Sequence, residues 1–561
     1  MTETLGVIRR WTWAAIALAA LGCSDDDDIV PGGGGATGTA GGAAAGGAGG
    51  AAGSGGVYEP APPTISGTVD GDDWSLPATA AQAPYSGRYW AHLGYDSPAA
   101  EGMTEPHFAV NIHFTWREVN PSEGVFDWSS IDAVVEQVEA APTGMGFGLW
   151  PWYYDAEDLP LWLTSGYDIQ FLGTGGVAPW AGDFMTKIAP MIQALGARYG
   201  SHPRLVYAEM RCPYDWEFGE YSHRGAMDEI LAVGAPFLQW FNGFTDLWAG
   251  AFAGAEHKLV SQVASTWHPD TEAIIAHSYS RGTGQRDGMP SQALIIGSVY
   301  SHHEDADGYI TLDSDHPPLA GRAFYGSEDT EFNPETDDFG DPAHTWYRFH
   351  HATFWSLMTR RNWLAIPRRL FDVEPYGAFI DWVWLELGHD AATAPDAWSW
   401  TNEIEHTYPP RTTKNYERWL MQRDVAPDGL TVAAEPGPDP DDLYGHWEHS
   451  AEYAARRTDA SSGSSFVYYR LAPEFLSGGP QRAEIKVSYL DGPTWHLEYL
   501  GYDGPMAAPD VTPDGSGAWK TVTYLIDDLM LDGRAFDGMD FRLANGGPGE
   551  LTVKLVRAVR P

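Results

Sequence analysis

Hydrophobic and polar positions follow two different periods in the middle of the chain. Residues 108–115 are apolar at alternate positions, which is typical of a strand with one buried face. An apolar stripe from Ile131 through Val135 to Val138 has instead the spacing of one helix face. The change of period predicts that strands and helices alternate along this part of the chain.

About eight or nine strands separated by helices are expected between residues 89 and 403. A βα alternation of this length is typical of a (β/α)8 TIM barrel, which takes roughly 200 to more than 400 residues. An open doubly wound sheet is the alternative, but the glycine-rich phosphate loop that it needs is missing. The other strands are expected at residues 89–93, 145–150, 204–210, 259–264, 273–278, 321–328 and 363–366. The other helices are expected at residues 184–195, 342–359 and 376–387.

The pattern changes at residues 433–441, a Pro-rich and acidic run that predicts a domain boundary. Beyond it, short strand-like runs follow one another with turns rich in Gly, Pro and Asp, which favours an antiparallel β-sandwich, jelly-roll-like. We therefore expect the barrel at residues 80–432 and the sandwich, as an independent carbohydrate-binding-like unit, at residues 441–561. The sandwich strands are expected at residues 465–471, 483–490, 495–499, 519–526, 540–543 and 551–556.

The first residues read as an export signal. Arg9 and Arg10 precede an apolar run at residues 11–21 that is too short to span a bilayer. The run ends in Ala20-Leu-Gly-Cys23, which resembles a bacterial lipobox. This resemblance implies a lipoprotein signal peptide at residues 1–22, lipidation of Cys23, and a place in the bacterial cell envelope, at the outer membrane or cell surface. An ordinary signal peptide is the alternative.

Residues 23–57 are expected to be a disordered tether. After a run of four Asp residues, the 26 residues 31–56 contain 14 Gly and 8 Ala. Such a segment cannot bury enough apolar surface to order itself. It would hold a folded body away from the membrane, which the chain would contact through its lipid anchor only.

Composition narrows the classes of partner. The 561 residues carry a net charge of −44, so a nucleic-acid phosphate backbone would be repelled and no nucleic acid is expected as a partner. Two Cys residues exclude a disulfide framework. No metal or cofactor is expected, and residues 282–288 are interpreted as a loop because they miss the dinucleotide fingerprint. Aromatic residues make up 13% of the chain, and their faces suit flat apolar ligand surfaces. The oligomeric state is left open.

Two segments carry a family resemblance. Residues 114–132 begin Phe-Thr-Trp-Arg, continue through Asn120-Pro121, and reach an aromatic-Asp-Trp helix start. Residues 192–220 contain an Arg-Tyr-Gly helix end and close on Gly-Glu. Both resemble clan A glycoside hydrolases, especially the β-galactosidase-like family 42, over roughly residues 88 to 400. Asn120 stands where that family has Glu, and the Asn-Glu dipeptide that ends its fourth strand is absent.

The resemblance implies two catalytic carboxylates. Clan A enzymes carry the acid/base after the fourth barrel strand and the nucleophile after the seventh, and in retaining enzymes the two lie about 5 to 5.5 Å apart. The matching positions are Glu220 for the acid/base and Glu328 for the nucleophile. Glu209 and Glu217 are the alternatives for the first role, and Glu331 for the second. Each could instead be an ordinary carboxylate of an acidic protein.

Aromatic and basic residues at the predicted strand ends are the candidate substrate contacts. Sugar rings stack on aromatic faces, although any one of these Trp residues could simply pack the barrel. Arg211 alternates with Glu209 and Tyr207, so these side chains are expected to share a network inside the barrel that tunes a pKa. The substrate-binding candidates are Trp116, Arg117, Trp150, Trp152, Tyr154, Arg211 and Trp216.

The sequence therefore predicts a glycoside hydrolase that cleaves O-glycosidic bonds in oligo- or polysaccharides by a retaining mechanism, with carbohydrate as its substrate. The alternative is a non-catalytic carbohydrate-binding surface lipoprotein whose barrel has lost its activity. The missing Asn-Glu dipeptide favours this second interpretation.

Overall fold

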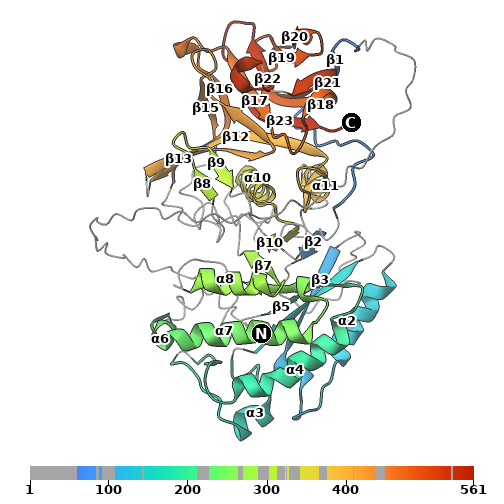
Figure 1. Cartoon of the computed structure of the whole chain (residues 1–561), viewed down its shortest axis with the longest axis vertical. Coiled ribbons are helices and arrows are strands. Elements are labelled where there is room, and N and C mark those ends of the chain that lie inside the picture. Colours follow the sequence, from blue (N-terminus) through green and yellow to red (C-terminus); the bar gives the residue numbers. More distant parts are fainter. Residues whose placement is uncertain are drawn as a thin grey trace, which may run out of the picture. The chain divides into compact units, whose positions relative to one another are not determined.

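The structure is a computed structural model that describes most of the chain after residue 59 (Figure 1). The predicted signal peptide, Cys23 and the predicted tether lie outside the described residues. Among those described, no helix is long and apolar enough to cross a membrane. The described residues are 60–83, 87–90, 108–141, 145–153, 155–173, 175–210, 227–262, 270–287, 302–312, 323, 325–327, 342–365, 370, 376–407, 410–437, 449–531, 533 and 535–561.

Eight strands pair side by side in parallel, and the last pairs with the first, so that the sheet closes on itself. In chain order β5 is the fourth of these strands and β10 the seventh, as the sequence predicts. The eight strands are β2 (Gly87–Trp90), β3 (Phe108–Thr115), β4 (Gly146–Trp152), β5 (Leu205–Glu209), β6 (Leu259–Gln262), β7 (Gly284–Asp287), β10 (Tyr325–Ser327) and β11 (Trp363–Ala365).

Helices alternate with these strands, and the predicted α/β class is confirmed. The apolar face of β3 is buried, and Ile131, Val135 and Val138 face the same core from α2, as their spacing predicts. The helices are α1 (Trp116–Val119), α2 (Ser129–Ala140), α3 (Leu161–Gly166), α4 (Phe184–Tyr199), α6 (Met227–Val233), α7 (Ala235–Ala251), α8 (Thr271–Ser280), α10 (Pro342–Met358) and α11 (Tyr376–Glu386).

One predicted strand is wrong. Residues 273–278 belong to the helix α8, where Ile274, Ile275 and Ser278 are buried at helical spacing. A short apolar run does not distinguish a buried strand from a buried helix face, which explains the error. The strand is β7 instead, inside the segment 282–288 that the sequence analysis interprets as a loop.

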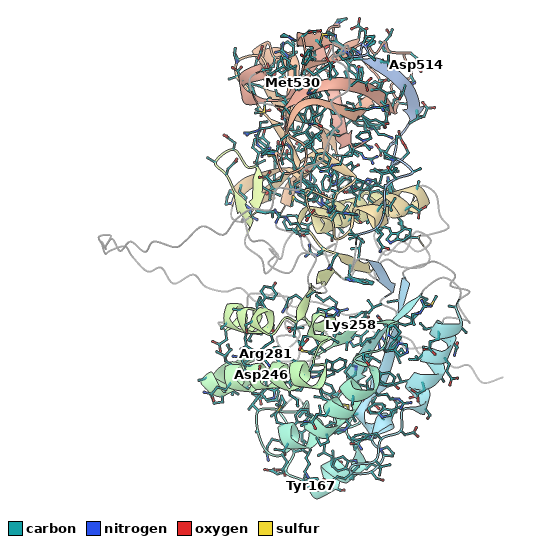
Figure 2. All side chains as sticks on the ribbon, turned by 45° about the vertical axis from the view of Figure 1, so that its right-hand side comes forward. Tyr167, Asp246, Lys258, Arg281, Asp514 and Met530 are labelled. Atoms are coloured by element: carbon teal, nitrogen blue, oxygen red, sulfur yellow. The ribbon has the colours of Figure 1, made fainter. Side chains whose placement is uncertain are left out.

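Polar contacts hold α8 against α7. Asp246 of α7 accepts from His277 at 3.0 Å, and it pairs with the Arg281 guanidinium at 2.9 Å (Figure 2). Arg281 lies at the C-terminal end of α8, which directly precedes β7. These exposed contacts therefore help to set where β7 enters the closed sheet.

The C-terminal part of the chain forms two antiparallel sheets. They share one core, to which Val487 and Tyr524 contribute from the larger sheet and Leu497 and Leu543 from the smaller. The larger sheet runs β1 (Thr64–Asp70), β21 (Trp519–Leu531), β18 (Gly478–Leu490), β23 (Thr552–Val559), β12 (Asp396–Thr407), β16 (His449–Thr458) and β15 (Thr431–Pro436), with β13 (Pro410–Arg418) on β12. The smaller runs β14 (Leu420–Arg423), β17 (Phe466–Leu471), β22 (Phe541–Asn545), β19 (Trp495–Gly501) and β20 (Gly504–Ala507). A separate hairpin joins β8 (His302–Glu304) to β9 (Ile310–Leu312).

The antiparallel sheets begin earlier in the chain than the division predicted at residues 433–441. Strand β12 already pairs with β23, and β1 adds a strand from the start of the described chain. Residues 433–436 of the Pro-rich run belong to β15, which pairs with β16 in the same sheet, and residues 438–441 lie outside the described residues.

The larger sheet is covered on its other face by α10 and α11. Trp398 and Trp400 of β12 are buried beside Phe354 of α10, with ring centroids 4.8 and 5.1 Å apart. A buried ion pair joins Arg348 of α10 to Glu452 of β16 at 3.0 Å. Because β12 is buried on both faces, this sheet depends on its helices as well as on the smaller sheet.

Candidate active site

Aromatic and polar side chains line the inside of the closed parallel sheet. On β3, Val110 and Ile112 pack outward in the large core shared with the helices. Ala109 belongs instead to a separate cluster with Trp150 and Tyr207. Since side chains alternate between the faces of a strand, this second cluster fills the interior of the ring.

A buried ion pair spans this interior. Glu209 is the last residue of β5, and its carboxylate lies 3.1 Å from the Arg286 guanidinium of β7. The two side chains are 0% and 2% exposed. The guanidinium also lies 4.8 Å from the ring centroid of Trp150. A buried carboxylate is tolerated when a partner compensates its charge, and the Arg286 guanidinium is in the place to do so for Glu209.

His113 and two Trp residues form an aromatic group beside this pair. The His113 ring lies 4.4 Å from Trp150 and 6.0 Å from Trp152, measured between centroids. The Trp152 indole N–H donates to His113 Nδ1 at 3.3 Å. Because Nδ1 accepts, a neutral His113 carries its proton on Nε2. His113 and Trp152 lie near the C-terminal ends of β3 and β4, the edge at which barrel enzymes carry their active sites.

Two of the predicted substrate contacts, Trp116 and Arg117, make structural contacts in the described chain. Trp116 is fully buried in α1, donates to Asn120 Oδ1 at 3.0 Å, and packs edge-on against Phe184. Arg117 donates to the carbonyl oxygens of Leu159 and Ala156 at 2.8 and 2.7 Å. These contacts hold the segment after β4. Trp116 is buried, whereas Arg117 is half-exposed and its predicted contact with a substrate stays a prediction. The aromatic pattern does not reveal burial, which depends on α4 packing across the strand ends.

The remaining candidates divide between buried, partly exposed and undescribed positions. Trp150 is 2% exposed and packs inside the ring, whereas Trp152 is partly exposed at the end of β4. Glu328 directly follows the last residue of β10 in the sequence. The candidates outside the described residues are Tyr154, Arg211, Trp216, Glu217, Glu220, Glu328 and Glu331.

Sequence reasoning missed two residues of the interior. It placed Arg211 in a network with Glu209, but the described partner of Glu209 is Arg286, which comes from the segment predicted as a loop. It also passed over His113, although this residue and Asn111 alternate on the inward face of β3. Polar side chains on that face were the available signal. Within the described ranges, no cluster of three or more His, Cys, Asp and Glu side chains could hold a metal ion.

Comparisons with known proteins find structural neighbours only. No protein-family model matches the chain, and no curated protein matches it. Similar solved structures include a β-galactosidase from the psychrophilic Marinomonas ef1, which is 12% identical in sequence. The match covers 47% of this chain and 49% of that chain, with a TM-score of 0.29. Endo-glycoceramidase II from Rhodococcus sp. is 11% identical. Its match covers 79% of this chain and 96% of that chain, with a TM-score of 0.30. The chain thus spans about half the length of the first neighbour and nearly all of the second, and both neighbours are glycoside hydrolases.

Proposed function

We propose that this protein is a glycoside hydrolase that cleaves O-glycosidic bonds in oligo- or polysaccharides by a retaining mechanism. In this proposal the closed parallel sheet is a TIM-type (β/α)8 barrel related to the family 42 enzymes, and the antiparallel sheets are a jelly-roll-like sandwich. One observation carries it: eight parallel strands close on themselves, and in the sequence Glu220 stands in the segment after the fourth strand while Glu328 directly follows the seventh. Clan A enzymes place their two catalytic carboxylates after these strands.

The proposed mechanism divides two steps between two carboxylates. Glu328 attacks the anomeric carbon and forms a covalent glycosyl-enzyme, while Glu220 gives its proton to the leaving oxygen. Glu220 then takes a proton from the water that releases the sugar. Glu209 is the alternative acid/base, but its carboxylate is fully buried against the Arg286 guanidinium, whereas a general acid must reach the leaving oxygen. We therefore assign Glu209 to the support of the site and Glu220 to proton transfer.

Two variants distinguish these assignments. Glu220→Gln is expected to lower kcat by roughly 100-fold or more on a glycoside with a poor leaving group, and much less on an activated aryl glycoside that needs little protonation. Glu209→Gln should slow both substrates to a similar extent, because it disturbs the buried Arg286 rather than the proton transfer. Steady-state kinetics on the two substrates measure this, with thermal unfolding as a control for folding. A leaving-group dependence in Glu209→Gln alone would transfer the acid/base role to Glu209.

A second candidate function is carbohydrate binding without catalysis. The fourth strand ends in Ala208-Glu209 rather than Asn-Glu, and this departure favours it. A panel of chromogenic glycosides separates the two functions. Turnover that is lost in Glu328→Gln supports the hydrolase, whereas binding of a polysaccharide by a protein that cleaves no member of the panel supports the binding function.

We further propose that the protein is held at the bacterial cell envelope by a lipid on Cys23, with carbohydrate as its other partner. The lipobox-like Ala20-Leu-Gly-Cys23 supports this. Cys23→Ala is expected to move the protein from the membrane fraction to the soluble fraction, because the thiol that takes the lipid is gone. Fractionation of the producing cells, with Cys212→Ala as the matched control, measures the change. A soluble wild-type protein with an unmodified N-terminus elsewhere would exclude the anchor.

A further inference from the structure

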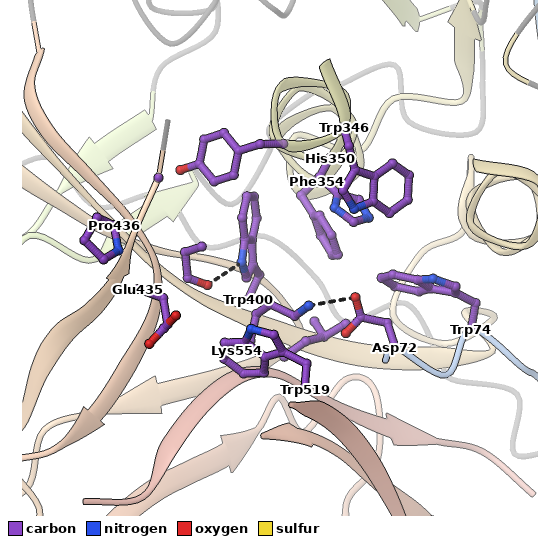
Figure 3. A pocket seen from close by; sticks show the side chains of 14 residues that line it. Asp72, Trp74, Trp346, His350, Phe354, Trp400, Glu435, Pro436, Trp519 and Lys554 are labelled. Carbon is purple, nitrogen blue, oxygen red and sulfur yellow. Dashed lines mark hydrogen bonds and ion pairs between the residues drawn. The ribbon is translucent and has the colours of Figure 1, made fainter. Parts of the chain in front are cut away.

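A second pocket lies between α10 and the larger antiparallel sheet (Figure 3). Its volume is about 450 Å³, within the roughly 300–1,000 Å³ of small-molecule sites. No residue that lines it belongs to a strand of the closed parallel sheet, so it is separate from the candidate active site. Helix α10 contributes Trp346, Tyr347, His350 and Phe354, the sheet contributes Trp400, Glu435, Trp519 and Lys554, and the segment before β2 contributes Asp72 and Trp74.

Four indole rings face this pocket, and they differ in exposure. Trp400 is 4% exposed, and its N–H donates to the Ala454 carbonyl oxygen at 3.1 Å, so it belongs to the packing of the sheet. Trp74, Trp346 and Trp519 are partly exposed instead. They come from three separate stretches of sequence and surround one hollow (Figure 3). Partly exposed indoles that converge in this way provide flat apolar surface to a ligand.

Polar groups stand among these rings. The Lys554 ammonium lies 2.7 Å from Asp72 Oδ2 and 4.9 Å from the centroid of Trp519 (Figure 3). Burial raises the pKa of Asp72, but the attraction of Lys554 outweighs it, so the net pKa is lowered. Burial lowers the pKa of His350 to about 3, which leaves this imidazole neutral at ordinary pH. The pocket therefore offers one compensated ion pair, a neutral His and the carboxylate of Glu435.

We propose that this pocket binds a neutral sugar ring of an oligosaccharide and holds it without cleaving it. The C–H face of a pyranose stacks on an indole, and its hydroxyl groups can bond to an ammonium and a carboxylate at the same time. The carboxylate of Glu435 and the chain's net charge of −44 oppose an anionic sugar. This second site goes beyond the proposed hydrolysis, because it requires binding only.

Calorimetry with cellobiose, lactose and maltose as separate probes tests the proposal. At least one disaccharide is expected to bind, and Trp519→Ala is expected to weaken that binding by about tenfold or more, because the indole surface is lost. Trp519→Phe should restore part of the affinity, since it keeps an aromatic face. Tyr502→Ala is the matched control, because Tyr502 is an exposed aromatic residue of the same sandwich that does not line the pocket.

Each contrary result has a definite meaning. Equal affinity in the wild type and in a folded Trp519→Ala variant, or no binding of any disaccharide, overturns the proposal. Choline that binds in a Trp519-dependent way, while no disaccharide does, overturns it in favour of a cation site. If Trp519-dependent disaccharide binding persists in a protein that cleaves no glycoside, the proposed hydrolase function fails and this inference stands. If Trp519→Ala cleaves glycosides as well as the wild type but no Trp519-dependent binding exists, this inference fails and the proposed hydrolase function stands.

Discussion

Replacing Glu328 by Gln is expected to lower kcat by about a thousandfold or more, while the thermal unfolding temperature changes little. An amide cannot form the covalent glycosyl-enzyme that a retaining mechanism requires, so the residual rate would come from binding and orientation alone. Glu331→Gln is the matched control, three residues further along the same segment, and should retain most of the activity. Near-normal rates in Glu328→Gln, with loss in Glu331→Gln, would exchange the two roles.

The stereochemistry of the product tests the same step independently. A double displacement through Glu328 gives a first product with the anomeric configuration of the substrate. NMR of the product before it mutarotates measures this in the wild-type enzyme. Inversion would exclude the retaining mechanism, whatever the kinetics of the variants.

Removal of residues 442–561 is expected to give an insoluble or unfolded protein, in contrast to the independent sandwich that the sequence suggests. The truncation leaves β12 paired with β13 but removes β16 and β23, which pair with successive parts of β12 in the larger sheet. It also removes most of the core that covers Ala397 on the other face of β12, and it leaves Arg348 buried without Glu452. Expression, solubility and circular dichroism of the truncated chain measure the outcome.

A single substitution tests the contact between α10 and the larger sheet without removing any strand. Arg348→Met leaves Glu452 in a buried place without its guanidinium, which costs about 3–5 kcal/mol of unfolding free energy. The double variant Arg348→Met, Glu452→Leu should recover much of this loss, since no unpaired charge remains.

A truncated protein that stays soluble and cleaves small glycosides at the wild-type rate would show that the barrel does not need the sandwich.

Local periodicity was enough to predict the strands and helices whose own residues show a clear hydrophobic pattern or end signal. The strand at residues 108–115 and the helix α10 were predicted within one residue, because alternation and an N-terminal Pro are readable in a short window. The sequence count also makes β5 the fourth strand and β10 the seventh, although its sixth strand was the helix α8 and the true sixth strand, β7, was missed. It located the C-terminal ends of these strands, and with them the part of the chain where carboxylates were sought.

Only the tertiary structure decided which residues meet. Glu209 pairs with Arg286, 77 positions further along the chain, on a strand whose four residues carry no apolar pattern. The burial of Trp116 and the membership of β12 in a sheet with β23 likewise depend on segments distant in sequence. Periodicity reports which face of an element is apolar, whereas its partner is selected by hydrogen bonds and packing between remote segments. The pocket at Trp519 exists for this reason, since its lining residues come from seven separate stretches of the chain.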